Sequence, residues 1–361
     1  MTLKPLAPGA RIGILGGGQL GRMMAQSAAE LGFLVHIYCP EPDCPAAQVA
    51  PEFTCADYSD QKALKAFAES VDAITYEFEN VPQDTAHFLN TFRPVAPAPK
   101  ALGIAQDRWL EKTFIQDQGI DVAQFFDITS RDDLVKALDT LGGNGILKTR
   151  RFGYDGKGQW RLSPTSNIDE IYAELNAQPA ILEGLVLFQS EISVIIARDY
   201  EGNIACYDPT ENSHENHILR HSRVPGNMSV DLQQNAQQIA HKIATALDYI
   251  GVLAIELFIA DQKLIVNEIA PRVHNSGHWT MDAAATSQFT QHIRAISAWP
   301  LGSAIRHSNV EMENLLGDEI NNWLSLASEP NCHIHLYGKQ EAKPGRKMGH
   351  VNRTSPFTQT R

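Results

Sequence analysis

The chain has 361 residues, 43% of them hydrophobic, so it is long enough to bury a substantial core and to form two or three domains. Its 42 acidic and 30 basic residues give a net charge of −12, which argues against nucleic acid or an anionic membrane as the main partner. Five scattered cysteines without CxxC spacing favour a reducing cytoplasm over a zinc site or a disulfide framework. The sequence contains no apolar run of about 18 residues and no signal-peptide pattern, so we expect no membrane span.

The first hundred residues alternate strand and helix patterns. Apolar strands are expected over 11–15, 34–40 and 73–82, and helices over 23–31 and 61–72. This alternation predicts a parallel sheet. The proline-rich segment 93–100 marks a boundary, so we expect a first domain over residues 1–98.

A glycine-rich turn, Gly16 to Gly21 (GGGQLG), fits the GxGxxG pattern between the first strand and the first helix. Such a turn presents backbone amides to phosphate, and Glu41 lies near the position of a ribose-binding acid. These features alone favour a nicotinamide enzyme. A tight strand-to-helix turn needs the same glycines whatever it binds, so the motif by itself decides nothing.

The middle of the chain mixes helices and strands. Helices are expected over 107–118, 130–142, 168–176, 232–247 and 281–299, and strands over 145–151, within 180–207 and over 252–269. The last helix ends before Pro300, which sets a second boundary. We therefore expect a second domain over 99–299 and a small third domain over 300–361.

A second glycine loop, Gly153 to Gln159 (GYDGKGQ), follows the strand that contains Lys148. It is not a Walker A loop, because Arg151 and Gly158 stand where that pattern needs Gly and Ser or Thr. Its glycines and lysine can still cover phosphates as a flap. Lys148 lies in an apolar strand, where a lysine needs an anionic partner or must reach solvent.

Glu256 and Glu268 lie on two apolar runs separated by Asp261-Gln262-Lys263. A hairpin with a three-residue loop places the two glutamates opposite each other, about 5 Å apart. Two bare carboxylates at that distance repel by roughly 3 kcal/mol at an effective dielectric of about 20, so a cation between them is expected. The pair predicts a magnesium site that also holds nucleotide phosphates, against the alternative of two solvated acids.

Polar side chains gather beyond this hairpin. Arg272, His274 and Asn275 precede a helix and suit a small oxyanion such as bicarbonate. A basic cluster occupies residues 339–353 and favours a small anionic ligand.

Glu183 and Glu191 bracket another apolar run, where one of them can bind a ribose or both can lie on the surface. The histidines of residues 213–221 have no zinc-like spacing.

Together these segments resemble the ATP-grasp ligases, and most closely the 5-(carboxyamino)imidazole ribonucleotide synthases of purine biosynthesis. The matching stretches are ILGGGQLGRM, TYEFENVP, QDRWLEK, LKTRRFGYDGKGQ, EISVIIARD, NEIAPRVHNSGHWT, HLYGK and RKMGH. They run in order from residue 14 to 350 and cover nearly the whole chain. The resemblance implies an α/β protein with an ATP-grasp fold, an N-terminal Rossmann-like parallel-sheet domain and a small C-terminal domain.

The resemblance also implies roles for individual residues, which are stated here as expectations. The ATP site is expected to comprise Arg108, Lys148, Gly153, Tyr154, Asp155, Gly156, Lys157, Gly158, Gln159, Glu183, Gly184, Leu185, Val186, Glu191, His214, Asn267 and Glu268. The ribonucleotide site is expected to comprise Gln19, Leu20, Glu77, Tyr154, Arg272, Lys339, Arg346 and Lys347. Catalytic roles are expected for Asp155, Arg272, His274, Asn275 and Lys339, and Mg²⁺ is expected on Glu256 and Glu268.

One departure from the superfamily is visible. Many members place Asn two residues after the second metal glutamate, where this chain has Ala270, so a third side-chain ligand to the metal is in doubt.

The implied reaction uses ATP and Mg²⁺ to convert bicarbonate to carboxyphosphate and then carboxylates the amine of aminoimidazole ribonucleotide. The resemblance further implies a homodimer. Two alternatives stay open at this point, a formate-dependent glycinamide ribonucleotide transformylase of the same superfamily and a nicotinamide-dependent dehydrogenase.

Overall fold

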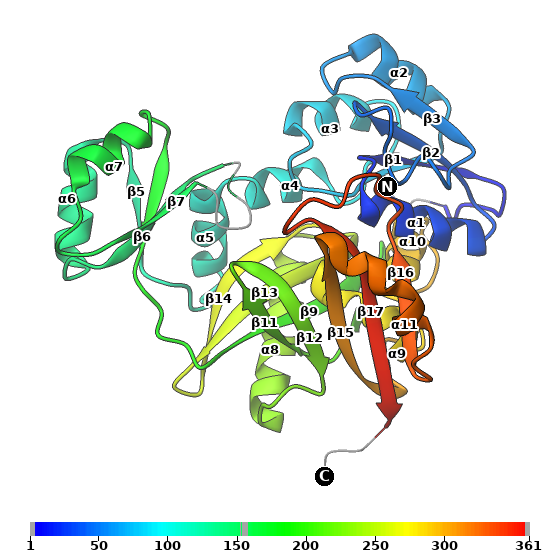
Figure 1. Cartoon of the computed structure of the whole chain (residues 1–361). Coiled ribbons are helices and arrows are strands. Elements are labelled where there is room, and N and C mark those ends of the chain that lie inside the picture. The colour runs from blue at the N-terminus through cyan, green and yellow to red at the C-terminus, as the bar shows by residue number, and fades with distance from the viewer. Residues whose placement is uncertain (1–3, 152, 154–157, 358–361) are drawn as a thin grey trace.

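The strand–turn–helix start of the chain forms a four-stranded parallel sheet, as the alternation of patterns predicts. In the computed structural model of Figure 1, which describes residues 4–151, 153 and 158–357, the strand order is β3-β2-β1-β4. The sequence did not predict β3, a short edge strand whose residues are only partly buried and lack an apolar pattern. The elements are β1 (Arg11–Leu15), α1 (Gln19–Glu30), β2 (Leu34–Cys39), β3 (Glu52–Cys55), α2 (Gln61–Glu69), β4 (Ala73–Tyr76) and α3 (Gln83–Asn90).

A second lobe stands apart from the rest of the molecule at the left of Figure 1. Its antiparallel sheet has the order β5-β8-β6-β7, and α6 and α7 pack on it around an apolar core of its own. Its elements are β5 (Phe125–Ile128), α6 (Arg131–Thr140), β6 (Gly145–Thr149), β7 (Gln159–Leu162), α7 (Ile168–Glu174) and β8 (Ala180–Glu183).

The largest sheet has nine strands and occupies the centre of the molecule (Figure 1). Its order is β14-β13-β9-β11-β12-β15-β17-β16, with β10 paired to β9, so the C-terminal strands extend this sheet and form no sheet of their own. The strands are β9 (Ser190–Arg198), β10 (Ile204–Cys206), β11 (Thr210–Glu215), β12 (Ile218–Val224), β13 (Gly251–Ala260), β14 (Lys263–Ala270), β15 (Ser308–Leu316), β16 (Cys332–Leu336) and β17 (Lys347–Pro356).

Successive side chains along the strands of the central sheet belong to two separate hydrophobic cores. Leu253, Ile255 and Leu257 of β13 pack with the helix α8 (Val230–Ala246). Val252 and Ala254 of the same strand join a core that continues into the N-terminal sheet. Because successive strand residues point to opposite faces, Glu256 shares the face of Val252 and Ala254.

The remaining helices connect these units. The expected helix over 281–299 is in fact two helices, α9 (Thr280–Ala283) and α10 (Gln288–Ile296), because residues 284–287 are not helical and Ser287 caps the second helix. Between the N-terminal sheet and the second lobe lie α4 (Pro99–Ala105) and α5 (Arg108–Asp117), and α11 (Trp323–Ala327) packs on β16. Within the described part of the chain, no helix is both long and apolar enough to cross a membrane.

Candidate active site

Glu256 and Glu268 are paired across β13 and β14, as the sequence predicts, but the predicted three-residue loop is wrong. The turn has only two residues, since Ala260 pairs with Lys263. Asp261 and Gln262 both have positive φ, 48° and 62°, which is the backbone of a type I′ hairpin turn. The pairing shifts by one residue between Glu256 and Leu257. Glu256 therefore still pairs with Glu268, although the turn is one residue shorter than predicted.

This shift is a β-bulge at Asn267, and it decides which way Glu268 points. Leu264 and Val266 lie in the core beneath α8, and strict alternation would place residue 268 there too. Instead Ile269 occupies that core, and Ala270 belongs to the opposite one. The bulge therefore moves Glu268 to the face that carries Glu256.

The two glutamates form an acidic pair whose charge is only partly offset by protein groups. Burial and the charge of Glu268 raise the pKa of Glu256 to about 8. Arg108 Nη1 lies 3.3 Å from Glu268 Oε2, and His274 Nε2 lies 3.3 Å from Glu256 Oε1. Facing carboxylate oxygens are hard ligands that suit Mg²⁺ together with phosphate oxygens, so these residues fit the metal.

A two-carboxylate site agrees with the rest of the local structure. Ala270 is 9% exposed and offers no side-chain ligand. Among the residues that the structure describes, no group of three His, Cys, Asp or Glu side chains is arranged to hold a metal by itself. A metal on this pair would therefore complete its shell with ligand oxygens or water.

His274 is held in one tautomer. Its Nδ1 accepts a hydrogen bond from the backbone N–H of Ser276 at 3.3 Å, so the proton of the neutral ring lies on Nε2, facing Glu256. Burial and the neighbouring charge of Arg272 lower the pKa of His274 well below its ordinary value, which agrees with a neutral ring. The next residue, Asn275, exchanges two amide hydrogen bonds, 2.9 and 2.7 Å, with Asn314 of β15.

Lys148 has the anionic partner that its apolar strand requires, and the partner is Glu183. Lys148 Nζ lies 2.9 Å from Glu183 Oε2, and Lys112 Nζ lies 3.6 Å from Glu183 Oε1. Burial alone would raise the pKa of Glu183, but the two ammonium groups overcome that effect and lower it to about 2. In this structure Glu183 therefore neutralises two lysines at the end of β8.

The connection between β8 and β9 follows Glu183 directly. Gly184 N donates to Gln124 O at 2.8 Å, and Leu185 and Val186 are half-buried. At the start of β9, Glu191 Oε2 lies 2.7 Å from His214 Nδ1, which raises the pKa of His214 against the opposing effect of burial. The ion pair brings together two residues predicted for the ATP site.

The predicted glycine flap is described only at its ends. Gly153 O accepts a hydrogen bond of 3.1 Å from Arg108 Nη2, and Gln159 pairs with Lys148 across β6 and β7. Gly158 has a φ of 69°, which favours glycine. The predicted residues Tyr154, Asp155, Gly156 and Lys157 lie outside the described part of the chain.

The first glycine turn holds a carboxylate of the protein itself. Gly21 N donates to Glu77 Oε2 at 2.7 Å, and Gly18 N donates to Glu77 Oε1. Gln19 is half-buried and Leu20 is buried at the start of α1. Glu77 therefore occupies the amides that would receive a dinucleotide phosphate, which argues against the nicotinamide alternative.

The basic C-terminal residues lie near this turn. Lys339 Nζ donates to Lys347 O at 2.7 Å, and Arg346 Nη1 donates to Glu341 O at 3.1 Å. A hydrogen bond of 2.8 Å from Gln48 to Gly338 O ties this segment to the N-terminal unit. The pKa of Lys339 is lowered to about 8, mainly by burial and to a smaller extent by repulsion from Arg346. The charge of Glu77 acts in the opposite direction.

Arg272 has a partner that sequence reasoning missed. Its Nε donates to Glu79 Oε2, and this contact, together with the charge of Arg272, lowers the pKa of Glu79 against the effect of burial. Glu79 lies in the quoted stretch TYEFENVP, so the segment was noticed but not this residue. Asn314 gave no signal, because a single polar residue in a strand is not distinctive.

Glu111 and Lys112 were missed as well. They follow Arg108 by three and four residues, a spacing that places all three on one face of a helix, and this signal was available in the sequence. Glu111 is 2% and Lys112 1% exposed.

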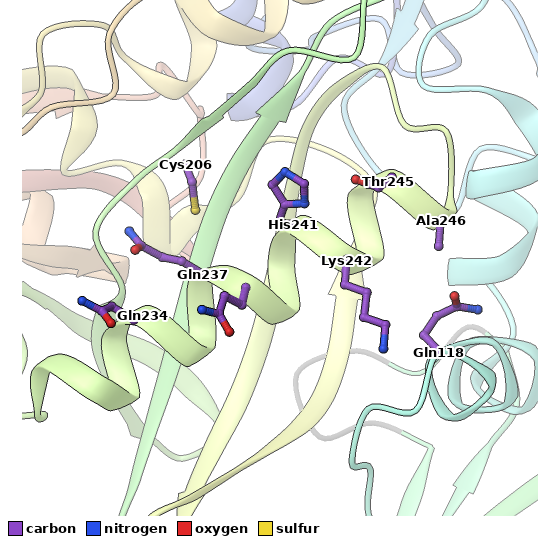
Figure 2. Close-up of a pocket in the computed structure, with 9 residues that line it drawn as sticks. Gln118, Cys206, Gln234, Gln237, His241, Lys242, Thr245 and Ala246 are labelled. Atoms are coloured by element: carbon purple, nitrogen blue, oxygen red, sulfur yellow. The ribbon is translucent and has the colours of Figure 1, made fainter.

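A separate hollow of about 790 Å³ lies along α8, as Figure 2 shows. No described residue that was predicted for the active site lines it. It is lined by Gln118, Cys206, Gln234, Gln237, Gln238, His241, Lys242, Thr245 and Ala246.

Three family models match successive parts of the chain. Residues 10–106 match the ribonucleotide synthetase preATP-grasp domain, residues 113–289 the ATP-grasp domain, and residues 311–360 the phosphoribosylaminoimidazole carboxylase C-terminal domain. The fold, the paired glutamates and these matches define an ATP-grasp ligase.

Similar proteins narrow the class to one family. The chain is 51% identical to the N5-carboxyaminoimidazole ribonucleotide synthase of Brucella melitensis, over 99% of this chain and 100% of the relative. It is 42% identical to the Bacillus subtilis enzyme of the same name, over 97% and 93% of the two chains. The chain belongs to the N5-carboxyaminoimidazole ribonucleotide synthase family, ATP-dependent ligases of purine biosynthesis.

Solved structures of this family have the same fold. The Staphylococcus aureus N5-carboxyaminoimidazole synthetase complexed with ADP superposes with a TM-score of 0.93 at 37% identity, over 98% of this chain and 95% of that one. The Aspergillus clavatus synthase in complex with ADP and 5-aminoimidazole ribonucleotide gives 0.89 at 30% identity, over 97% and 94%.

Proposed function

We propose that the protein uses MgATP and bicarbonate to carboxylate the exocyclic amine of 5-aminoimidazole ribonucleotide. The products are N5-carboxyaminoimidazole ribonucleotide, ADP and phosphate. The observation that carries this proposal is the pairing of Glu256 with Glu268, with Arg108 and His274 in contact with the pair. The relatives that bind ADP and 5-aminoimidazole ribonucleotide support the choice of ligands.

Glu256 and Glu268 are the proposed holders of Mg²⁺. When bound, the metal would supply positive charge to the phosphates of ATP and weaken the repulsion between the two carboxylates. Arg108 contacts both Glu268 and the Gly153 carbonyl, so it ties the acidic pair to the start of the flap. Lys148, at the end of β6, is the second cation assigned to the phosphates.

The chemistry needs charge neutralisation and positioning more than covalent help. A bicarbonate oxygen attacks the γ-phosphorus of ATP, and ADP leaves, which forms carboxyphosphate. The amine nitrogen then attacks the carbonyl carbon, or the CO2 that carboxyphosphate releases, and phosphate leaves. Arg272, held in place by Glu79, is assigned to the bicarbonate oxyanion.

The amine must lose a proton in the second step, and the geometry around His274 bears on the acceptor. Both ring nitrogens of His274 are engaged, Nδ1 by the Ser276 N–H and Nε2 by Glu256. We therefore assign His274 to orienting Glu256 and propose Asp155, which is outside the described residues, as the proton acceptor. Asp155→Asn should still hydrolyse ATP in the presence of bicarbonate but form little carboxylated product. Normal product yield in this variant would remove Asp155 from that role.

ADP release measured with each substrate omitted in turn tests the reaction. We expect turnover to require ATP, bicarbonate and 5-aminoimidazole ribonucleotide together, with no turnover when formate replaces bicarbonate. Turnover with formate and not with bicarbonate would refute the proposal and favour a transformylase.

The metal assignment has its own test in Glu268→Gln, which keeps the size of the side chain but removes its charge. We expect ADP formation to be lost while the thermal midpoint stays within a few degrees of the wild-type value. Glu311→Gln, a similar change in β15, should leave ADP formation unaltered. Full activity in Glu268→Gln would contradict the metal assignment.

The cellular setting and the assembly are also proposals. A cytoplasmic location is supported by the five cysteines, all of which are free thiols in the structure. A homodimer is supported by exposed apolar side chains such as Trp323 and Leu324, which are 50% and 66% exposed. The three domains, 1–98, 99–299 and 300–361, stay as proposed from the sequence.

A further inference from the structure

The bulge at Asn267 is the feature that places Glu268 in the active site, so the groups that hold it matter for catalysis. Without the extra residue, Glu256 would face Asn267, and Glu268 would point into the apolar core beneath α8. A bulge leaves backbone groups unpaired within its own ladder. β14 is also the edge strand of its sheet, and two backbone groups beside the bulge are bound by side chains from outside the sheet.

The binding groups come from one face of α5. Glu111 Oε1 accepts the backbone N–H of Ile269 at 2.6 Å, and Lys112 Nζ donates to the carbonyl of Asn267 at 2.8 Å. Arg108, one turn earlier on the same face, contacts the side chain of Glu268 itself. Three consecutive residues of the bulged strand are thus each bound by one of three neighbouring side chains of a single helix.

The helix that carries these side chains is itself well anchored. Asp107 caps its N-terminus by accepting from the backbone of Trp109 and Leu110 at 3.0 and 3.3 Å. The same carboxylate binds Arg150 Nη2 at 2.8 Å, so α5 is tied to the segment that follows β6. Just before the bulge, Val266 N donates to Asp121 O at 2.9 Å, in the segment that follows α5.

Burial makes the contacts of Glu111 and Lys112 costly to lose. Both side chains are almost completely buried, at 2% and 1% exposure. A buried carboxyl or ammonium group is kept only where it has well-placed partners. Both side chains bind the backbone of β14, and Lys112 also lies 3.6 Å from Glu183.

We propose that Glu111 and Lys112 are positioning residues that hold the β-bulge at Asn267 and thereby keep Glu268 opposite Glu256. They act on the metal-binding pair through backbone groups of β14. The inference rests on the proposed metal role of the two glutamates. It extends that role to a helix that lies more than 150 residues earlier in the chain.

Two conservative substitutions at Glu111 separate this role from simple packing. Glu111→Gln keeps the length of the side chain and an oxygen acceptor for the Ile269 N–H. Glu111→Asp keeps the carboxyl group but shortens the side chain by one methylene, which takes the acceptor out of reach. Gln291→Asn is the matched control, because Gln291 is a buried polar side chain that binds the backbone of Gly302 at 2.6 and 2.7 Å away from the acidic pair.

The readout is the affinity of the full-length protein for Mn²⁺ in the presence of saturating ADP, followed by electron paramagnetic resonance. Losing a residue that orients a metal ligand typically lowers the metal affinity about tenfold to a hundredfold. We therefore expect Glu111→Asp to weaken Mn²⁺ binding at least about tenfold, with Glu111→Gln and Gln291→Asn within about threefold of wild type. Binding of metal-free ADP in EDTA should change little in all three variants.

Each outcome has a distinct meaning. Wild-type Mn²⁺ affinity in folded Glu111→Asp would overturn the inference, as would a loss in Glu111→Gln that equals the loss in Glu111→Asp. If Glu111→Asp fails to fold, Lys112→Met tests the other side of the same bulge, with the same loss expected and a wild-type affinity again contradicting the inference. A wild-type protein that binds no Mn²⁺ with ADP would contradict the proposed metal role itself, which is a different failure.

Discussion

Glu183 is the residue whose loss should do most to destabilise the second lobe and its junction with α5. Its side chain is 6% exposed and lies 2.9 Å from Lys148 and 3.6 Å from Lys112. Lys112 is itself almost wholly buried. Among the described residues, Glu183 carries the only negative charge within ion-pair distance of Lys112. Glu183→Gln removes this charge and leaves the volume of the side chain almost unchanged.

The size of the effect follows from the pKa of this carboxyl group. The pKa falls from an ordinary value of 4.5 to about 2 in the folded protein. A difference of about 2.5 pH units corresponds to roughly 3 kcal/mol of stability at neutral pH. Breaking a buried ion pair by removing one partner costs about 3–5 kcal/mol, in agreement with that figure. With about 2.1 cal/mol/K of unfolding entropy per residue, 361 residues give about 0.76 kcal/mol/K, so we expect the thermal midpoint to fall by roughly 4 °C.

The pH dependence provides a second check. Because the folded pKa is depressed, the contribution of Glu183 is fully present above pH 4.5 and is lost as the pH falls toward about 2. The gap between wild type and Glu183→Gln should therefore be constant near neutral pH and shrink below pH 4.5.

Thermal unfolding at several pH values measures this gap. Glu69→Gln is the control, because Glu69 is exposed on α2 and pairs with Lys65 at 3.8 Å, so its loss should cost under about 0.5 kcal/mol. A loss below about 1 kcal/mol in Glu183→Gln, or a gap that persists unchanged into acid, would refute the ion-pair reasoning.

Two further predictions concern α5 and the basic cluster. Asp107→Ala removes a helix cap and one of two carboxylates that bind Arg150, the other being Asp127, so it should cost about 2–3 kcal/mol by thermal unfolding. Asp60→Ala, which removes the cap of α2, should cost about 1 kcal/mol, and equal losses in the two variants would exclude a contribution from Arg150. Because the pKa of Lys339 is about 8, its charge is present below that pH, and KM for the ribonucleotide should rise as the pH increases through 8. Lys339→Ala should raise KM at pH 7 with little change in ATP binding and should abolish the rise above pH 8; an unaltered KM would remove Lys339 from the site.

Local patterns in the sequence predicted much of the fold. Alternation of apolar strands with helices identified the parallel N-terminal sheet, and the polar break at Asp261 identified the hairpin that pairs Glu256 with Glu268. The helix expected over 107–118 and the need of Lys148 for a counter-charge were visible as well, because both depend on local patterns.

Other features depended on contacts between distant segments, and no local pattern reports these. The edge strand β3 forms because β2 offers it hydrogen-bonding partners, and its own residues carry little signal. The C-terminal strands join the central sheet through the pairing of β12 with β15, which are separated in the sequence by a helix, a hairpin and two further helices. Likewise, Glu183 was expected in the ATP site, and only the folded chain shows that two lysines share its carboxylate.

The active-site hairpin contains one feature that the sequence determines and another that only the tertiary structure determines. The sequence by itself determined that two acids lie on adjacent strands at a separation that allows them to meet. Tertiary structure decided how they meet, through a two-residue turn and a bulge at Asn267 that Glu111 and Lys112 of α5 support. The physical reason is that a change of one residue in register turns Glu268 from one face of the strand to the other, and the groups that bind the strand at the bulge lie on a helix far away in the sequence.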